Sequence, residues 1–166
     1  MQKIDDKILY YIHNHLYSSY VVKVMKIFTH LGDFCCVWLF YVMIALLRQE
    51  RRLALSLLLA MLLVNAINNG FIKAVFRRNR PFEDHLDIRI EIDNPYGSSF
   101  PSGHSANGFA CAVVISSFYL DFGFIAFVLA GLIAISRMYL KVHYFSDVLI
   151  GSVVGILTGL ALLVIM

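Results

Sequence analysis

The sequence predicts an all-α protein, a bundle of membrane-spanning helices in a single domain over residues 1–166. Hydrophobic residues make up 60% of the chain and charged residues only 15%, against about 45–50% and about 25% in soluble domains. The mean hydropathy is +0.74, so the bilayer must be the solvent for much of the chain. At about 20 apolar residues per span, we expect about five spanning helices, or six if the amino-terminal segment also spans.

The amino-terminal segment, residues 1–28, has the composition of a helix that lies in the membrane interface. Between Ile4 and Ile27, lysines are mixed with tyrosines and aliphatic side chains, which suits an interfacial helix better than a spanning one. Asn14 and the serine pair at 18–19 are expected to interrupt this helix. The segment also lacks the cleavage site of a signal peptide.

Five apolar stretches follow, each long enough or nearly long enough to cross the hydrocarbon core. They run from about residue 31 to 47, 53 to 72, 105 to 120, 123 to 140 and 145 to 166. The three cysteines show no disulfide framework, and we interpret them as small apolar residues.

The connections between these stretches are unequal in length. If every stretch crosses once, the tight turns at 48–52 and 121–123 lie on one side of the membrane. The only long connection, residues 73–104, lies on the other side and is the expected active-site loop. Within it, residues 86–93 alternate between apolar and polar side chains, which favours a short strand.

Charged side chains near a membrane helix centre cost about 2.5–3.5 kcal/mol each and are therefore candidate functional residues. The first group is Lys73 and Arg80, which are seven residues apart. On one helix they would lie within about 20° of the same face. Snorkelling to the interface is an open alternative for this pair, and it is the favoured interpretation for Arg77 and Arg78.

The second group is residues 101–104, a Pro-Ser-Gly turn that leads into an apolar helix. Free amides at a helix start bind anions, Gly103 allows a close approach, and the Ser102 hydroxyl adds a donor. His104 stands in the first turn beside that anion. A plain capping turn with an interfacial histidine is the alternative.

The third group joins Arg137, at the end of the fourth stretch, to His143 and Asp147. A spacing of four places Asp147 one helical turn beyond His143. Its carboxylate can then accept the Nδ1 proton and leave Nε2 free as a nucleophile or base. A structural ion pair of Asp147 with Arg137 or Lys141 is the alternative.

The three groups converge if the stretches alternate across the membrane. They then supply three cations, a turn rich in amides and two histidines on one side. Such a site suits a phosphoryl group, because cations and amides offset its charge while one imidazole attacks phosphorus and another protonates the leaving oxygen. No cluster of thiolates or carboxylates indicates a metal.

At these residues the sequence resembles the type 2 phosphatidic acid phosphatase family, whose motifs read Lys-x6-Arg-Pro, Pro-Ser-Gly-His and Ser-Arg-x5-His-x3-Asp. All three occur in order and at full spacing, from Lys73 to Pro81, at residues 101–104 and from Ser136 to Asp147. The resemblance extends from about residue 29 to 166. The family core commonly has six spans, and here the first is reduced to the segment at 4–27.

The resemblance implies a covalent mechanism. His143 attacks phosphorus and becomes a phosphohistidine, Asp147 orients its imidazole, and His104 protonates the leaving group and then activates water. The residues that hold the phosphate oxygens are Lys73, Arg80, Ser102, Gly103 and Arg137. The family needs no metal, so no cofactor is expected.

The expected substrate is a lipid phosphate or diphosphate in the bilayer, since the chain has apolar flanks around the site and no soluble domain. For a small bacterial-looking member, the resemblance suggests undecaprenyl diphosphate first, with phosphatidylglycerol phosphate and phosphatidic acid as alternatives. Nucleic acid is not an expected partner, because no run of Lys or Arg lies on a polar surface. The sequence gives no indication of the oligomeric state.

The family's usual external active site predicts a plasma-membrane protein whose site is on the extracytoplasmic side. The arginines at 48, 51 and 52 are then cytoplasmic, although the opposite side carries more Lys and Arg in total, so the positive-inside rule does not decide the orientation.

Two other classes stay open. A non-catalytic lipid-phosphate binder or carrier could use the same cations, but binding alone needs no nucleophile with an orienting carboxylate. A vanadium haloperoxidase shares the three motifs on a soluble fold, which the composition opposes.

Overall fold

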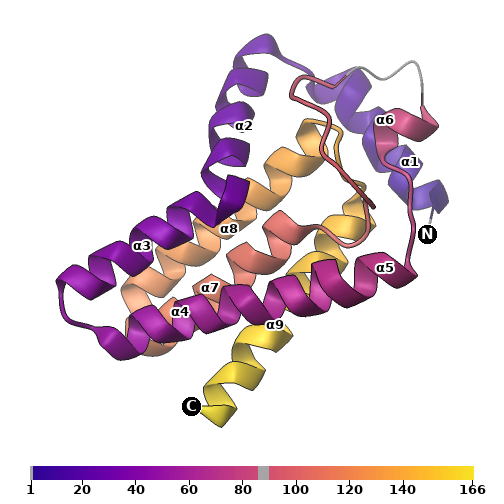
Figure 1. Ribbon diagram of the computed structural model, residues 1–166. Coiled ribbons are helices and arrows are strands. Elements are labelled where there is room, and N and C mark those ends of the chain that lie inside the picture. The colour runs from indigo at the N-terminus through magenta and orange to yellow at the C-terminus, as the bar shows by residue number, and fades with distance from the viewer. Residues whose placement is uncertain (1, 86–89) are drawn as a thin grey trace.

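The computed structural model describes residues 2–85 and 90–166, which form helices joined by loops (Figure 1). No strand occurs in these described ranges, so the predicted all-α membrane bundle is confirmed. The strand expected at 86–93 is not formed at residues 90–93, and residues 86–89 lie outside the described part. Among the described residues, four helical stretches are long and apolar enough to cross a membrane: Ser19–Leu47, Arg51–Val75, Leu120–Tyr139 and Phe145–Ile165.

The amino-terminal segment is divided into two helical pieces. Helix α1 (Gln2–Tyr11) continues into η1 (Ile12–Leu16), and α2 (Ser19–Gly32) follows. The chain is extended at Ser18, with φ −147° and ψ 134°, so the interruption expected at the serine pair is present. Asn14 lies inside η1 and does not break it. Helix α2 belongs to the first long apolar stretch, which therefore begins well before residue 31.

A sharp kink joins α2 to α3 (Cys36–Leu47) and is visible as the bend between them in Figure 1. The short turn η2 (Asp33–Cys35) forms it. Phe34 and Cys35 both have left-handed φ angles, of 50° and 59°. Side chains other than glycine rarely adopt this conformation, so the kink is a specific feature of the backbone.

The second long stretch consists of α4 (Arg51–Val64), η3 (Asn65–Ile72) and α5 (Lys73–Val75). The chain leaves the helix at Phe76, which is extended with ψ 90°. The prediction that Lys73 and Arg80 share one helix was therefore wrong.

Pro81 explains why Arg80 itself is outside the helix. A residue before proline is driven out of the α region, and Arg80 is extended, with φ −86° and ψ 159°. The short helix α6 (Pro81–Asp84) begins directly after it.

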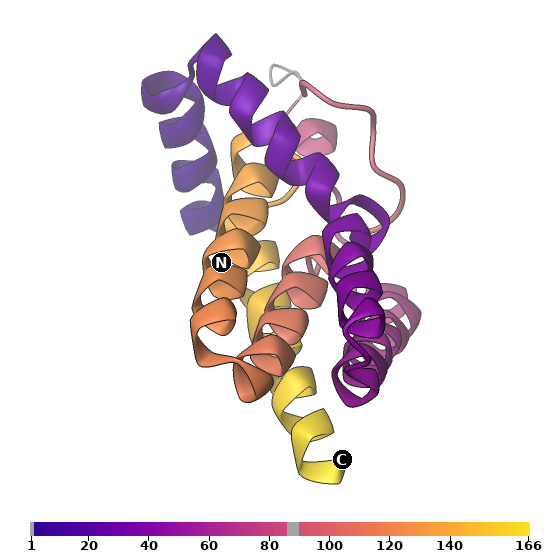
Figure 2. The same cartoon turned by 90° about the vertical axis from the view of Figure 1, so that its left-hand side faces the viewer.

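Helix α7 (Gly103–Phe118) lies at the centre of the bundle, enclosed by α4, α8 (Leu120–Tyr139) and α9 (Phe145–Ile165) (Figures 1 and 2). Glycines one turn apart on α9 face it at positions 151, 155 and 159. A Cβ atom at Gly155 would lie 2.2 Å from the carbonyl oxygen of Ala106. Only glycine allows the two backbones to come this close, and this contact fixes the start of α7 against the middle of α9.

Candidate active site

A cavity of about 230 Å³ opens at the amino-terminal end of α7. It is smaller than the roughly 300–1,000 Å³ typical of pockets that enclose a whole drug-sized ligand, so it suits a head group rather than a complete lipid. Six of the predicted site residues line it: Lys73, Arg80, Gly103, His104, Arg137 and His143. No Asp or Glu is among the described residues of its wall.

His143 lies in the connection between α8 and α9, at the buried side of this cavity. Its Nε2 atom is 3.3 Å from Nη1 of Arg80. A guanidinium can only donate, so Nε2 is the acceptor and the ring proton is on Nδ1. Burial lowers the pKa of His143 to about 3. The imidazole is therefore uncharged at neutral pH, as a nucleophile must be.

Asp147 lies behind His143, in the first turn of α9, and is fully buried. Its Oδ2 atom is 3.7 Å from Nδ1 of His143, which is longer than a hydrogen bond. Ser99 fills the gap, because its hydroxyl donates to Oδ2 at 2.5 Å and lies 3.5 Å from Nδ1. His143 precedes the helix instead of sharing it, yet the predicted proximity of the two side chains is found.

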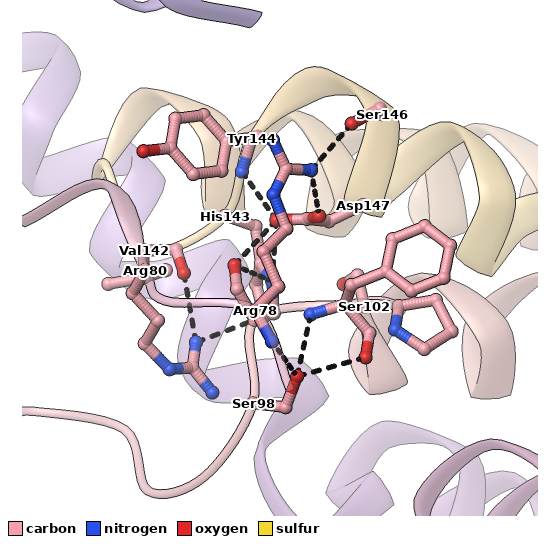
Figure 3. Close-up of polar contacts among 12 residues, drawn as sticks. Arg78, Arg80, Ser98, Ser102, Val142, His143, Tyr144, Ser146 and Asp147 are labelled. Carbon is pink, nitrogen blue, oxygen red and sulfur yellow. Dashed lines mark hydrogen bonds and ion pairs between the residues drawn. The ribbon is translucent and has the colours of Figure 1, made fainter. Parts of the chain in front are cut away.

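Arg78 provides the positive charge beside Asp147 (Figure 3). Its Nη1 donates to Oδ1 of Asp147 at 2.6 Å, and its Nη2 donates to Oδ2 of Asp5 at 2.7 Å. The guanidinium also lies 4.2 Å from the centre of the Tyr144 ring. The interpretation of Arg78 as a snorkelling side chain was therefore wrong, since it points into the protein to neutralise two carboxylates. Arg77 is exposed.

Asp5 attaches α1 to the start of α9. It is only 1% exposed. Its carboxylate accepts hydrogen bonds from the backbone amide and the hydroxyl of Ser146, at 2.9 and 2.6 Å. The amino-terminal helix thus packs behind the site, and Asp5, Arg78 and Asp147 form one chain of ion pairs.

The start of α7 forms another wall of the cavity. The Ser102 hydroxyl accepts hydrogen bonds from the amide and hydroxyl of Ser105, at 3.4 and 3.0 Å. Ser102 is fully buried and does not line the cavity, so its side chain caps the helix and does not face a ligand. Gly103 lines the cavity, where the first amides of a helix have no partner within the helix.

Neutral groups hold the cations that line the cavity. Arg80 donates to the carbonyl oxygens of Tyr96, Gly97 and Val142, at 3.2, 3.1 and 2.9 Å. Arg137 donates to the Thr29 hydroxyl, and its buried Nε has no partner in the described part of the chain. Within the described ranges, neither arginine nor Lys73 forms an ion pair with a carboxylate. Their charge is therefore available to an anion.

His104 contacts a residue of the kink between α2 and α3. Its Nε2 atom is 2.9 Å from Oδ1 of Asp33. No sequence motif contains Asp33, and the sequence also gave no reason to choose Asp5, Arg78 or Ser99. Arg78 and Ser99 lie close in the chain to predicted site residues, which was the only available signal for them. No such signal was available for Asp5 or Asp33.

Comparison with known proteins identifies this arrangement. The decaprenylphosphoryl-5-phosphoribose phosphatase of Mycobacterium tuberculosis is 33% identical over 134 residues, which cover 79% of this chain and 72% of the relative. The crystal structure of a transmembrane PAP2-type phosphatidylglycerolphosphate phosphatase from Bacillus subtilis matches with a TM-score of 0.81, at 26% identity over 99% of this chain and 85% of that one. The LpxE structure from Aquifex aeolicus also has a TM-score of 0.81, at 29% identity over 95% and 93% of the two chains.

The helical membrane bundle and its cationic, histidine-containing cavity define the class of this protein, a membrane lipid phosphatase. The family model described as PAP2 superfamily matches residues 53–166, which include all three motifs. The chain belongs to the PAP2 superfamily.

Proposed function

We propose that this protein hydrolyses a lipid phosphate or diphosphate through a phosphohistidine at His143. The observation that carries the proposal is the uncharged Nε2 of His143, which lies beside Arg80 in a cavity that holds three cations and no carboxylate in its described wall. Attack by Nε2 forms a P–N bond and breaks the P–O bond to the lipid, while His104 gives a proton to the leaving oxygen. Water then attacks phosphorus, His104 takes its proton, and phosphate leaves.

The remaining site residues hold and stabilise the phosphoryl group in this proposal. Lys73, Arg80 and Arg137 face its oxygens, together with the first amides of α7 at Gly103. Ser102 acts through the turn that its hydroxyl caps. Asp147 orients His143 and stabilises the positive charge that its ring acquires when it bonds to phosphorus. No metal takes part.

The substrate we propose first is undecaprenyl diphosphate, which would be converted to undecaprenyl phosphate. The cavity has room for a head group only, and exposed aromatic side chains at Phe34 and Tyr96 lie on its wall, where a lipid could leave it. The mycobacterial relative acts on a decaprenyl-linked substrate, which supports a polyprenyl tail. Phosphatidylglycerol phosphate and phosphatidic acid are the alternatives.

Release of phosphate from a panel of purified lipids tests this proposal. We expect the highest kcat/KM with undecaprenyl diphosphate, inhibition by vanadate and no effect of chelators. A higher value with phosphatidylglycerol phosphate or phosphatidic acid would reassign the substrate. Binding of these lipids without release of phosphate would instead indicate a carrier, and peroxide-dependent halide oxidation would indicate a haloperoxidase.

We further propose that the protein is in the plasma membrane with the cavity on the extracytoplasmic side. The loop that lines the cavity then faces outward and the turn containing Arg48 faces the cytoplasm. In a variant without native cysteines, Asn94→Cys should react with an impermeant maleimide in whole cells, while Arg48→Cys should react only after lysis. The reverse pattern would place the site in the cytoplasm.

A further inference from the structure

Asp33 connects the kink between α2 and α3 to His104. One carboxylate oxygen, Oδ1, lies 2.9 Å from Nε2 of His104, and the other, Oδ2, lies 2.8 Å from Nδ1 of His30. Asp33 is outside the three motifs, 71 residues from His104 in the chain. His104 is thus paired with a carboxylate that comes from a separate part of the fold.

The backbone around Asp33 is shaped to make this contact. Phe34 and Cys35, which follow it, are both left-handed, a conformation that costs roughly 1–2 kcal/mol for each residue with a side chain. Gly32, which precedes it, faces the ring, and a Cβ atom there would lie 2.6 Å from Cδ2 of His104. Strain that persists in a fold is a reason to look for a function. Here the strained turn ends α2 at the point where the Asp33 carboxylate contacts the His104 imidazole.

The pairing decides which nitrogen of His104 can exchange a proton with a ligand. Nε2 is occupied by Asp33, whereas Nδ1 has no hydrogen-bond partner among the described residues. A carboxylate on one ring nitrogen fixes the tautomer and favours the protonated ring. Nδ1 is then the atom that gives a proton to the leaving oxygen.

The charges around His104 make the carboxylate necessary. Lys73 at the start of α5, Arg137 on α8 and Arg80 in the loop line the same cavity as His104, and His143 is neutral. His30 on α2 faces Asp33 from the other side. Among the described residues, Asp33 is therefore the one carboxylate that forms an ion pair with His104.

We infer that Asp33 is a positioning residue for the second histidine: it holds His104 through Nε2 and keeps it able to protonate the leaving group from Nδ1. The inference rests on the proposed function, because it needs His104 to act as the acid. In the step, the electron pair of the broken P–O bond goes to the lipid oxygen, which takes the Nδ1 proton. The neutral ring that results accepts a proton from water in the second step.

Asp33→Asn tests the inference through leaving groups of different strength. A lipid alcohol is a poor leaving group and needs the proton, whereas p-nitrophenolate leaves without one. We expect kcat for phosphatidic acid to fall by about 10- to 100-fold, less than the roughly 100- to 10,000-fold that a general acid contributes in full, because His104 is still present. KM should be nearly unchanged, and the fall for p-nitrophenyl phosphate should be much smaller. The alkaline limb of the pH profile should move to lower pH, because the ring loses the charge that favours protonation.

The control for removal of a carboxylate is Asp121→Asn, at the exposed start of α8, which should behave as the wild type. In a His104→Ala background, Asp33→Asn should cause no further loss of kcat, because the two residues act as a unit. Gly32→Ala, which pushes the ring off Asp33, should give the same selective loss, and it decides the question if Asp33→Asn does not fold.

The results separate the inference from the proposed function. One outcome would overturn the role of Asp33 alone. In it, His143→Ala and His104→Ala lose activity, while Asp33→Asn keeps the alkaline limb of the pH profile and the leaving-group dependence of the wild type. Full activity in His143→Ala would overturn the proposed function as well.

Discussion

The two histidines of the cavity are each paired with a carboxylate, but the two carboxylates are stabilised in different ways. Asp147 is fully buried, and its partners besides His143 are Arg78, Ser99 and the backbone amide of Tyr144. The Asp33 side chain is 37% exposed, and its partners among the described residues are two histidines, His30 and His104. In both arrangements the carboxylate lies against one ring nitrogen and leaves the other to different partners, Nε2 in His143 and Nδ1 in His104.

The difference follows from the solvation of each carboxylate. A fully buried charge is strongly destabilising unless it is paired and hydrogen-bonded, so Asp147 requires groups from three separate parts of the chain. Water can solvate Asp33, which needs only a local kink in the backbone. His143, the proposed nucleophile, is therefore supported by the tertiary fold, and His104, the proposed proton donor, by a short, strained turn.

The largest expected effect distinguishes the two histidines by the step in which they act. His143→Ala removes the proposed nucleophile, so phosphate release should fall by at least about a thousandfold, with normal expression. His104→Ala keeps the proposed nucleophile but lacks the group proposed to activate water. It should therefore accumulate phosphoprotein from p-nitrophenyl phosphate, measured after rapid acid-free quenching. Phosphoprotein in His143→Ala would assign the nucleophile to another residue.

The next effect tests the support of the buried carboxylate. Arg78→Met leaves Asp147 and Asp5 without their cation, and loss of one partner of a buried ion pair costs about 3–5 kcal/mol. Because Arg78 is 18% exposed, we expect a loss of about 3 kcal/mol in the free energy of unfolding, measured by denaturation in detergent. Arg77→Met, at the exposed neighbour, is the matched control. Equal stability of the two variants would contradict the ion-pair chain.

A smaller effect tests whether the two histidines are held at a fixed separation. A Cβ atom at Gly151 would lie 2.5 Å from the carbonyl oxygen of Ser102, so Gly151→Ala forces α9 away from α7. Overpacking of this kind costs about 1–3 kcal/mol, and kcat should fall because His104 and His143 move apart. At Gly131 nothing lies within 4 Å of the same atom, so Gly131→Ala should retain activity. If both variants were equally active, the close contact would not set the geometry.

The smallest effect concerns the hydroxyl between His143 and Asp147. Ser99→Ala removes a hydrogen bond to a charged group, worth about 1.5–3 kcal/mol. We expect kcat to fall by about tenfold, at the lower end of this range, because Asp147 still binds Arg78. Ser152→Ala is the control, since the one partner of that hydroxyl in the described part of the chain is the Val148 carbonyl of its own helix. A wild-type rate in Ser99→Ala would mean that Asp147 acts on His143 directly.

The apolar stretches allowed the bundle to be predicted, and the three motifs allowed the cavity-lining residues to be predicted. Each stretch and each motif consists of residues that are near one another in sequence. The helix expected through Lys73 and Arg80 was wrong, since Pro81 excludes Arg80 from the α region. The kink also escaped prediction, because nothing in a local pattern indicates left-handed residues at Phe34 and Cys35.

The supporting residues could not be predicted for a different reason. Asp5 binds Arg78, 73 residues away, and Ser99 binds Asp147, 48 residues away. Such pairs arise only when the helices are packed, and an acidic residue near the amino terminus has the same local pattern whether it is solvated or buried.

The attachment of the first helix to the last also bears on the order in which the chain is made. The ribosome delivers Asp5 and Arg78 before it delivers Asp147, so this first pair can form while the carboxyl-terminal helix is still being synthesised. When α9 enters the membrane, the cation for its carboxylate is already in position. A charged side chain on a membrane helix is costly to insert, and this cost is then offset as α9 arrives and completes the site.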